Sequence, residues 1–167
     1  MTTDDSKVAR REWLATVARG VAGAGALTVI AALRAEAGEP AKPARLVVYK
    51  DPDCGCCKAW VTHLQTSGLT ADVSDRRDMS ALKDSLGVPQ ALRSCHTAVA
   101  GRYVIEGHVP AADIKRLLAR APRDIAGLAV PGMPTGSPGM EMPNRPAEPY
   151  SVIAYAADGS TRVFARH

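Results

Sequence analysis

Three of the chain's four cysteines lie within four residues, at Cys54, Cys56 and Cys57. The fourth is Cys95, and His96 follows it directly. A helix N-terminus favours thiolate over thiol, and clustered thiolates select soft or borderline ions such as copper(I) and zinc(II). These residues therefore form one candidate metal site.

Three other interpretations of the cysteines stay open. The spacing of Cys54 and Cys57 also fits a redox dithiol, so the chain could be a thiol-disulfide oxidoreductase that does not need Cys56 or Cys95. Four cysteines could instead form two structural disulfides, although adjacent Cys56 and Cys57 rarely join two independent bridges without strain. A structural zinc module, which would unfold on chelation, is the third alternative.

Methionine sulfur favours copper(I) over zinc(II), because zinc seldom takes methionine as a ligand. Met133, Met140 and Met142 share one Pro- and Gly-rich loop and could close over the cysteines. As an alternative, they are apolar packing residues. Copper is the expected ion, with zinc less favoured, and clustered thiolates could bridge more than one copper ion.

The other histidines and the nearby tryptophan receive structural assignments. His108 is expected on the surface at the start of a helix, although it could be a ligand. His63 and His167 are expected to be bystanders, and Trp60 a partly buried packing residue.

The hydrophobic pattern predicts the elements that position these residues. A helix is expected to follow Asp53, with Asp53 as its N-cap, and to end at Gly68. On this helix Cys57 should point toward the core, whereas Cys54 should lie at the exposed tip. The other expected elements are strands over 45–50 and 70–74, a helix over 79–86, a hairpin over 97–100 and 103–106, and a helix over 111–120.

This order of strands and helices predicts an α/β protein with a thioredoxin-like fold. In that fold Cys95 and His96 would come just before the hairpin's first strand and face the other cysteines. Residues 131–143 form the Met/Pro/Gly-rich loop, which cannot be regular helix or strand. A C-terminal β-hairpin over 150–156 and 161–165, turning at Asp158-Gly159, would add two strands.

The N-terminal residues have the pattern of an export signal. Arg10 and Arg11 precede an apolar stretch over 20–33, which ends near a small-x-small cleavage site at Ala35 and Ala37. The paired arginines resemble a twin-arginine signal, and the general secretory route is the alternative. An uncleaved membrane anchor is a further alternative, but the apolar stretch is short for a hydrocarbon layer of about 30 Å.

The chain accordingly divides into an export signal (1–37), a linker (38–44) and a metal-binding domain (45–167). We expect a periplasmic protein. The formal net charge is +4, and its basic residues are scattered among acidic ones, so nucleic acid is not an expected partner. Membrane contact is expected only through an uncleaved signal.

Several short motifs carry a resemblance to a known family. They are Tyr49-Lys50, Cys54-Gly55-Cys56-Cys57, Gly87-Val88-Pro89, Ser94-Cys95-His96-Thr97, Val104 to Pro110, Gly127 to Pro134, and Gly136 to Glu141. Together they resemble the periplasmic copper-resistance family that includes CopG, over the chain from Arg45 to the C-terminus. The resemblance implies a thioredoxin-like fold that binds copper through its cysteines and a role in copper resistance.

The sequence thus predicts an exported protein that holds copper(I) with clustered cysteines and buffers it, transfers it or cycles it between copper(I) and copper(II). The expected ligands are Cys54, Cys56, Cys57 and Cys95, with His96 and the loop methionines as further candidates. Other periplasmic copper-handling proteins are possible partners. Whether the chain is an enzyme, as a copper or thiol oxidoreductase, stays open.

Overall fold

The computed structural model describes residues 44–167. The predicted export signal, with Arg10, Arg11, Ala35 and Ala37, lies outside the described residues, as does most of the predicted linker.

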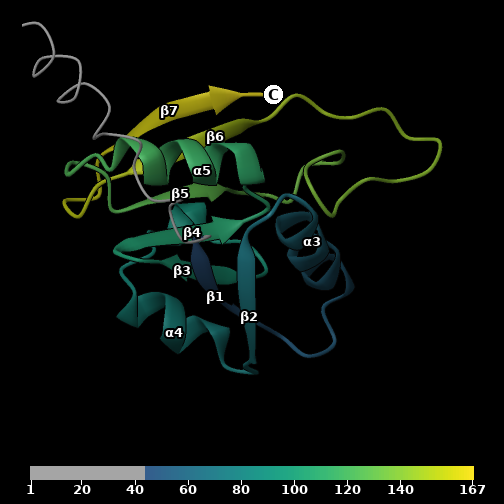
Figure 1. Cartoon of the computed structure of the whole chain (residues 1–167), viewed down its shortest axis with the longest axis horizontal. Helices are drawn as coiled ribbons and strands as arrows, with labels where there is room; N and C mark the ends of the chain where they lie inside the picture. Colours follow the sequence, from purple (N-terminus) through teal and green to yellow (C-terminus); the bar gives the residue numbers. More distant parts are fainter. Residues whose placement is uncertain (1–43) are drawn as a thin grey trace, which may run out of the picture. The chain divides into compact units, whose positions relative to one another are not determined.

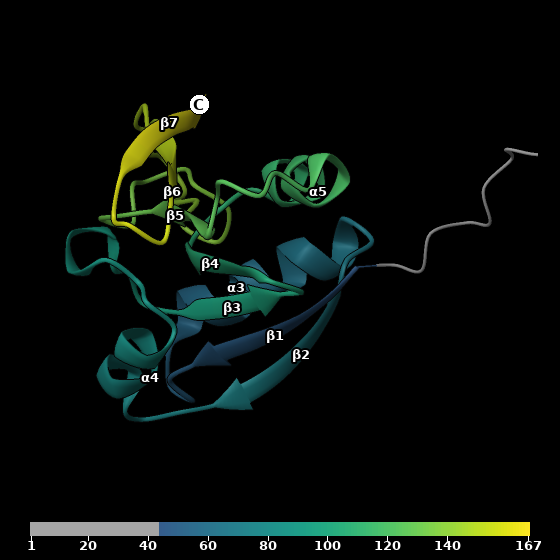
Figure 2. The same ribbon diagram turned by 90° about the vertical axis from the view of Figure 1, so that its left-hand side faces the viewer.

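Within residues 44–167, seven strands form one mixed sheet in the order β2-β1-β3-β4-β5-β6-β7. β1 pairs in parallel with β2, and β4 with β5, whereas the other neighbours are antiparallel (Figure 2). The strands are β1 (Arg45–Lys50), β2 (Thr70–Asp75), β3 (Thr97–Ala100), β4 (Tyr103–Gly107), β5 (Gly127–Val130), β6 (Ser151–Tyr155) and β7 (Thr161–Arg166).

Three α-helices in the described part of the chain cover the sheet, and a short 3-10 helix follows the second of them (Figure 1). These elements are α3 (Gly55–Thr66), α4 (Met79–Ser85), η1 (Gln90–Leu92) and α5 (Ala111–Arg120). Ala98 and Ile105 belong to the core shared with α3 and α5. Their neighbours Thr97 and Glu106 contact α4. Because side chains alternate along a strand, α4 lies on the opposite face from α3 and α5.

The main hydrophobic core lies between the sheet and the helices α3 and α5. Each large aliphatic side chain that is fully buried there contributes roughly 1.5–3 kcal/mol to folding. The core includes Leu46, Val48, Trp60, Leu64, Ile105, Ile114, Leu117 and Leu128.

Most elements agree with the sequence-based prediction, with three differences. The 3-10 helix η1 was not among the predicted elements. Asp53 is not the N-cap of α3: Cys54 takes that position without a side-chain cap, and the Asp53 N–H donates to Asp51 Oδ1. The short strand β5 was not predicted, because all four of its residues are buried and their pattern lacks alternation. Residues 131–150 after β5 contain neither helix nor strand.

Strand register brings four chain segments to one end of the sheet. Tyr49 at the end of β1 pairs with Thr97 at the start of the antiparallel β3. Thr97 pairs with Glu106 near the end of β4, and Gly107 pairs with Val130 at the end of the parallel β5. The residues after β1, before β3, after β4 and after β5 therefore meet at the same place.

No helix among the described residues is long and apolar enough to cross a membrane.

Gly107 lies where the segments before β3, after β4 and after β5 meet, and it should tolerate no side chain. It has φ +69°, and an added Cβ would lie 2.6 Å from Ser94 Cβ and 2.7 Å from Val130 O. Gly107→Ala should therefore lose about 1–2 kcal/mol from the left-handed backbone and roughly 1–3 kcal/mol more from the clash. Gly159→Ala is the matched control, because Gly159 has φ +83° and open space around it. Equal losses for both variants in urea denaturation would contradict the prediction.

Candidate metal centre

A tight turn between β1 and α3 carries the first three cysteines. The Cys54 N–H donates to Asp51 O at 3.1 Å, and the Lys58 N–H donates to Cys54 O at 3.3 Å. The chain thus enters α3 directly at Cys54, which places Cys56 and Cys57 in the first helical turn.

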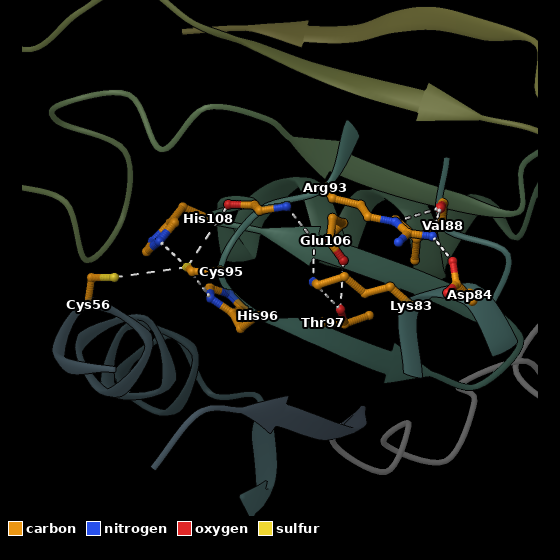
Figure 3. A network of polar contacts seen from close by, with 11 residues as sticks. Cys56, Lys83, Asp84, Val88, Arg93, Cys95, His96, Thr97, Glu106 and His108 are labelled. Atoms are coloured by element: carbon orange, nitrogen blue, oxygen red, sulfur yellow. Dashed lines mark hydrogen bonds and ion pairs between the residues drawn. The ribbon is translucent and has the colours of Figure 1, made fainter. Parts of the chain in front are cut away.

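The structure brings the four cysteines together, with each sulfur within 4.8 Å of the others. Cys54 and Cys57 form a disulfide, whereas Cys56 and Cys95 are free. The Cys56 Sγ lies 3.6 Å from Cys54 Sγ. It lies 3.9 Å from Cys95 Sγ (Figure 3). Cys57 is fully buried, as expected from its helical face, while Cys54 is half-buried instead of forming an exposed tip.

Two imidazoles contact Cys95: His96 is the next residue in the chain, and His108 follows β4, the strand that pairs with β3. The Cys95 Sγ lies 3.2 Å from His96 Nδ1 and 3.2 Å from His108 Nε2. The prediction of a surface position for His108 was wrong, because this residue is fully buried and Pro110 is the N-cap of α5. Sequence reasoning gave His108 only as a possible ligand and favoured the surface position, because the pairing of β3 with β4 is what brings it back to Cys95.

The ring of His108 is oriented by a backbone contact. His108 Nδ1 lies 2.8 Å from the carbonyl oxygen of Pro138 in the Met-containing loop. Because a carbonyl can only accept, Nδ1 carries the proton and Nε2 offers its lone pair toward Cys95. A histidine held this way is ready to coordinate a metal through Nε2.

His96 is enclosed between aromatic rings. Its ring centroid lies 4.3 Å from that of Trp60 and 4.9 Å from that of His108. Trp60 is fully buried, contrary to the expected partial burial, and its Nε1–H donates to Val109 O. The buried Nε2 of His96 has no hydrogen-bond partner among the described residues.

Burial sets the charges of this cluster. It raises the pKa of Cys95 to about 12, with the neighbouring Cys56 adding to the effect. Burial also lowers the pKa of His108, and it lowers that of His96 well below 6.5, with His108 and Lys83 contributing. At neutral pH both imidazoles are thus neutral, the form that binds metals, whereas Cys95 must lose a proton to become a ligand.

The three loop methionines line a surface pocket of about 380 Å³ beside Cys56. Met133 and Met142 are exposed at 40% and 43%, so both residues are partly accessible to solvent. Gly139 fixes the loop against α3, because an added Cβ would lie 2.8 Å from Trp60 N and 2.9 Å from Cys56 O. The structure therefore places Met133, Met140 and Met142 around a pocket that Cys56 also lines.

The two remaining histidines make contacts elsewhere. His63 Nε2 accepts a hydrogen bond from the Ala111 N–H at the start of α5. His167 Nε2 lies 2.7 Å from Asp113 Oδ2, far along the chain from the cysteines. Neither belongs to the groups of potential metal ligands found among the described residues.

These features define a mixed α/β protein with a sulfur- and imidazole-rich cluster at one end of its sheet. Residues 92–140 match the model of a family described as "Protein of unknown function, DUF411". A solved structure described as copper resistance protein CopG, form 2, is 45% identical, with a TM-score of 0.71; the match covers 75% of this chain and 99% of that one.

Form 1 of the same protein is 46% identical, with a TM-score of 0.70, over 75% of this chain and 98% of that one. A comparison with curated protein sequences gives no match. The chain belongs to the CopG family of copper resistance proteins.

The lowered histidine pKa values predict acid-sensitive stability of the metal-free protein. The pKa values of His63, His96 and His108 lie below their ordinary 6.5, so the unfolded chain binds more protons than the folded one below that pH. The free energy of unfolding should be highest above about pH 6.5 and should fall as the pH drops toward the pKa values of the folded state. Each histidine should account for a loss of about 1.4 kcal/mol for every unit by which folding lowers its pKa.

Urea denaturation with a chelator present, between about pH 7.5 and pH 5, measures this loss while most carboxylates stay ionised. His96→Phe should make the slope shallower, because it removes one buried titrating ring. A free energy of unfolding that does not change over this range would contradict the assignment.

Proposed function

We propose that this protein binds copper(I) through Cys54, Cys56, Cys57 and Cys95 and acts in copper resistance by buffering, transferring or redox-cycling the ion. The observation that carries the proposal is the grouping of four sulfur atoms within 4.8 Å of one another, in a chain of the CopG family. Thiolates in such a group suit copper(I), a soft ion.

The remaining donors extend this ligand set. His96 and the methionines Met133, Met140 and Met142 are candidate ligands, as the sequence suggested. His108, which the sequence left open as a ligand, joins them because its Nε2 faces Cys95. Thioether sulfur favours copper(I) over zinc, whereas imidazole binds either ion. Thiolates this close together can bridge metals, so the site is proposed to accept more than one copper ion.

The disulfide between Cys54 and Cys57 makes full loading depend on reduction. Cleaving this bond consumes two electrons and two protons and yields two thiols, which lose their protons when they bind copper. In the oxidised form only Cys56 and Cys95 offer free sulfur. A thiol or other two-electron donor must therefore act before four cysteines can bind the metal.

We further interpret the architecture as a thioredoxin-like fold. Its first strands, in the order β2-β1-β3-β4, and the helices on both faces support this interpretation. The strands β5, β6 and β7, together with the Met-containing segment before β6, would then be additions at one edge of the sheet.

The second candidate function is thiol-disulfide oxidoreduction, which the observed bond between Cys54 and Cys57 favours. A dithiol at a helix N-terminus can exchange electrons with protein thiols. This function needs Cys54 and Cys57 but neither Cys56 nor Cys95.

Anaerobic titration of the reduced protein with copper(I) tests the metal-binding proposal. Reduced wild type should bind copper(I), and Cys95→Ser should bind fewer ions or bind them more weakly, because it removes the sulfur that joins Cys56 to the two imidazoles. The oxidised wild type, in which Cys54 and Cys57 are bonded, should bind less copper than the reduced form. Saturation at one copper per chain would rule out the multinuclear site, and no binding would rule out the function.

The same variants separate the two candidate functions. Cys56→Ser and Cys95→Ser should keep full activity in a disulfide-reduction assay if the protein is an oxidoreductase. If it is a copper-binding protein, both variants should lose copper, whereas His167→Gln, a matched control outside the site, should keep it. Full reductase activity in both cysteine variants of a protein that binds no copper would overturn our proposal.

We also propose that the protein is exported to the periplasm and cleaved after Ala37. Fractionation and mass measurement of the exported form test this directly. Arg10→Lys with Arg11→Lys should block export by the twin-arginine route, which transports folded proteins, and should leave export intact by the general secretory route. A full-length protein that stays in the membrane fraction would support the uncleaved-anchor alternative instead.

A further inference from the structure

A buried ion pair lies next to the cysteine cluster, on the α4 face of the sheet. The Lys83 Nζ is 2.5 Å from Glu106 Oε1, and the two side chains are 6% and 0% exposed. Lys83 comes from α4, whereas Glu106 is the next-to-last residue of β4. Neither residue was predicted to act in the site, because nothing in their sequence positions indicates burial.

Glu106 is bonded to both ends of the segment that carries Cys95 and His96. Its Oε1 accepts a hydrogen bond from the Ser94 N–H at 2.6 Å, and its Oε2 accepts one from Thr97 Oγ1 at 2.7 Å. Ser94 directly precedes Cys95, and Thr97 directly follows His96. One carboxylate thus bridges the segment from end to end (Figure 3).

Lys83 and the β4 backbone complete this arrangement. The Lys83 Nζ donates to Thr97 Oγ1 at 2.7 Å as well as to the carboxylate. The Gly107 N–H donates to His96 O at 3.0 Å, and His108 follows one residue later. The position of Glu106 therefore affects Cys95 and both imidazoles that contact it.

Stability alone does not account for such a pair. Removing two charges from water costs several kcal/mol per ion, and well-packed apolar residues of similar volume are often as stable or more stable. Here the carboxylate also accepts hydrogen bonds from the half-buried Ser94 N–H and from the buried Thr97 hydroxyl. Apart from Lys83, both of its hydrogen-bond partners belong to the segment that presents Cys95.

We propose that Glu106, supported by Lys83 and Thr97, is a positioning residue that holds Cys95 at the distance from Cys56, His96 and His108 that metal binding requires. The proposal rests on the copper-binding function proposed above. Glu106 itself touches no metal in this scheme. It acts through the backbone of Ser94 and the hydroxyl of Thr97, as the supporting groups of metal ligands do.

A matched pair of double variants tests this role. Lys83→Met with Glu106→Gln and Lys83→Met with Glu106→Met both remove the two charges, so neither leaves a buried charge without a partner. The side chains at position 106 are similar in length. They differ in whether an oxygen remains to accept the Ser94 N–H.

Two measurements report on Cys95. The first is the rate of alkylation of Cys95 relative to Cys56, followed by peptide mass spectrometry in the metal-free protein with the Cys54–Cys57 disulfide intact. The second is the copper(I) affinity of the reduced protein, measured by competition with a chromogenic chelator. Thermal unfolding of both variants shows whether they are comparably folded.

The Glu106→Met version should differ several-fold from the Glu106→Gln version in the alkylation ratio, and it should bind copper(I) about tenfold more weakly, at comparable melting temperatures. A merely structural role would lower the melting temperature yet leave the ratio and the affinity equal in the two variants; that result overturns the proposal. Should the methionine version fail to fold, Thr97→Val removes one tie to Glu106 without changing charge, and the same two shifts are expected at smaller size.

These outcomes separate the two proposals. If wild type binds no copper but the alkylation ratios differ, the proposed function fails and the positioning role stands. If wild type binds copper and the two double variants agree in both measurements, the positioning role fails and the proposed function stands.

Discussion

The register of β3 between β1 and β4 is the constraint on which the site depends. It places the start of β3 beside the end of β1 and the end of β4, so Cys95 meets both the helix that carries Cys56 and the residue that follows β4, His108. A shift of β3 by one residue would turn Thr97 into the hydrophobic core and Ala98 out of it. Ala98 on β3 and Ile105 on β4 must both face the hydrophobic core. This requirement therefore fixes the geometry of the cluster as well as the fold.

Burial then decides the chemical state of the groups brought together. Removal from water keeps the thiol of Cys95 protonated and the rings of His96 and His108 neutral. These three groups are thus uncharged in the metal-free protein, which suits their buried positions. A soft cation would replace the proton on sulfur and find imidazole nitrogens already in their binding form, which couples metal loading to proton release.

The disulfide and the free thiols give the cluster two kinds of chemistry in one place. Cys54 and Cys57 occupy the positions of a redox dithiol, and Cys56 with Cys95 supplies sulfur that such a pair does not need. Cys56 contacts both Cys54 and Cys95, so it links the disulfide to the second free thiol. The oxidation state of Cys54 and Cys57 and the number of metal ions that the cysteines can bind are therefore expected to depend on each other.

The sequence by itself determined the cysteine cluster, the order of most elements and the family, because these depend on local spacing and on the period of apolar residues. It gave no sign of β5, whose buried residues do not alternate, and it misplaced His108, His96's neighbour in space, on the surface. It also left Lys83 and Glu106 unremarked, since charged residues are ordinarily exposed. Only tertiary structure decided these points, because strand pairing joins residues distant in the chain and so sets which polar groups are buried together.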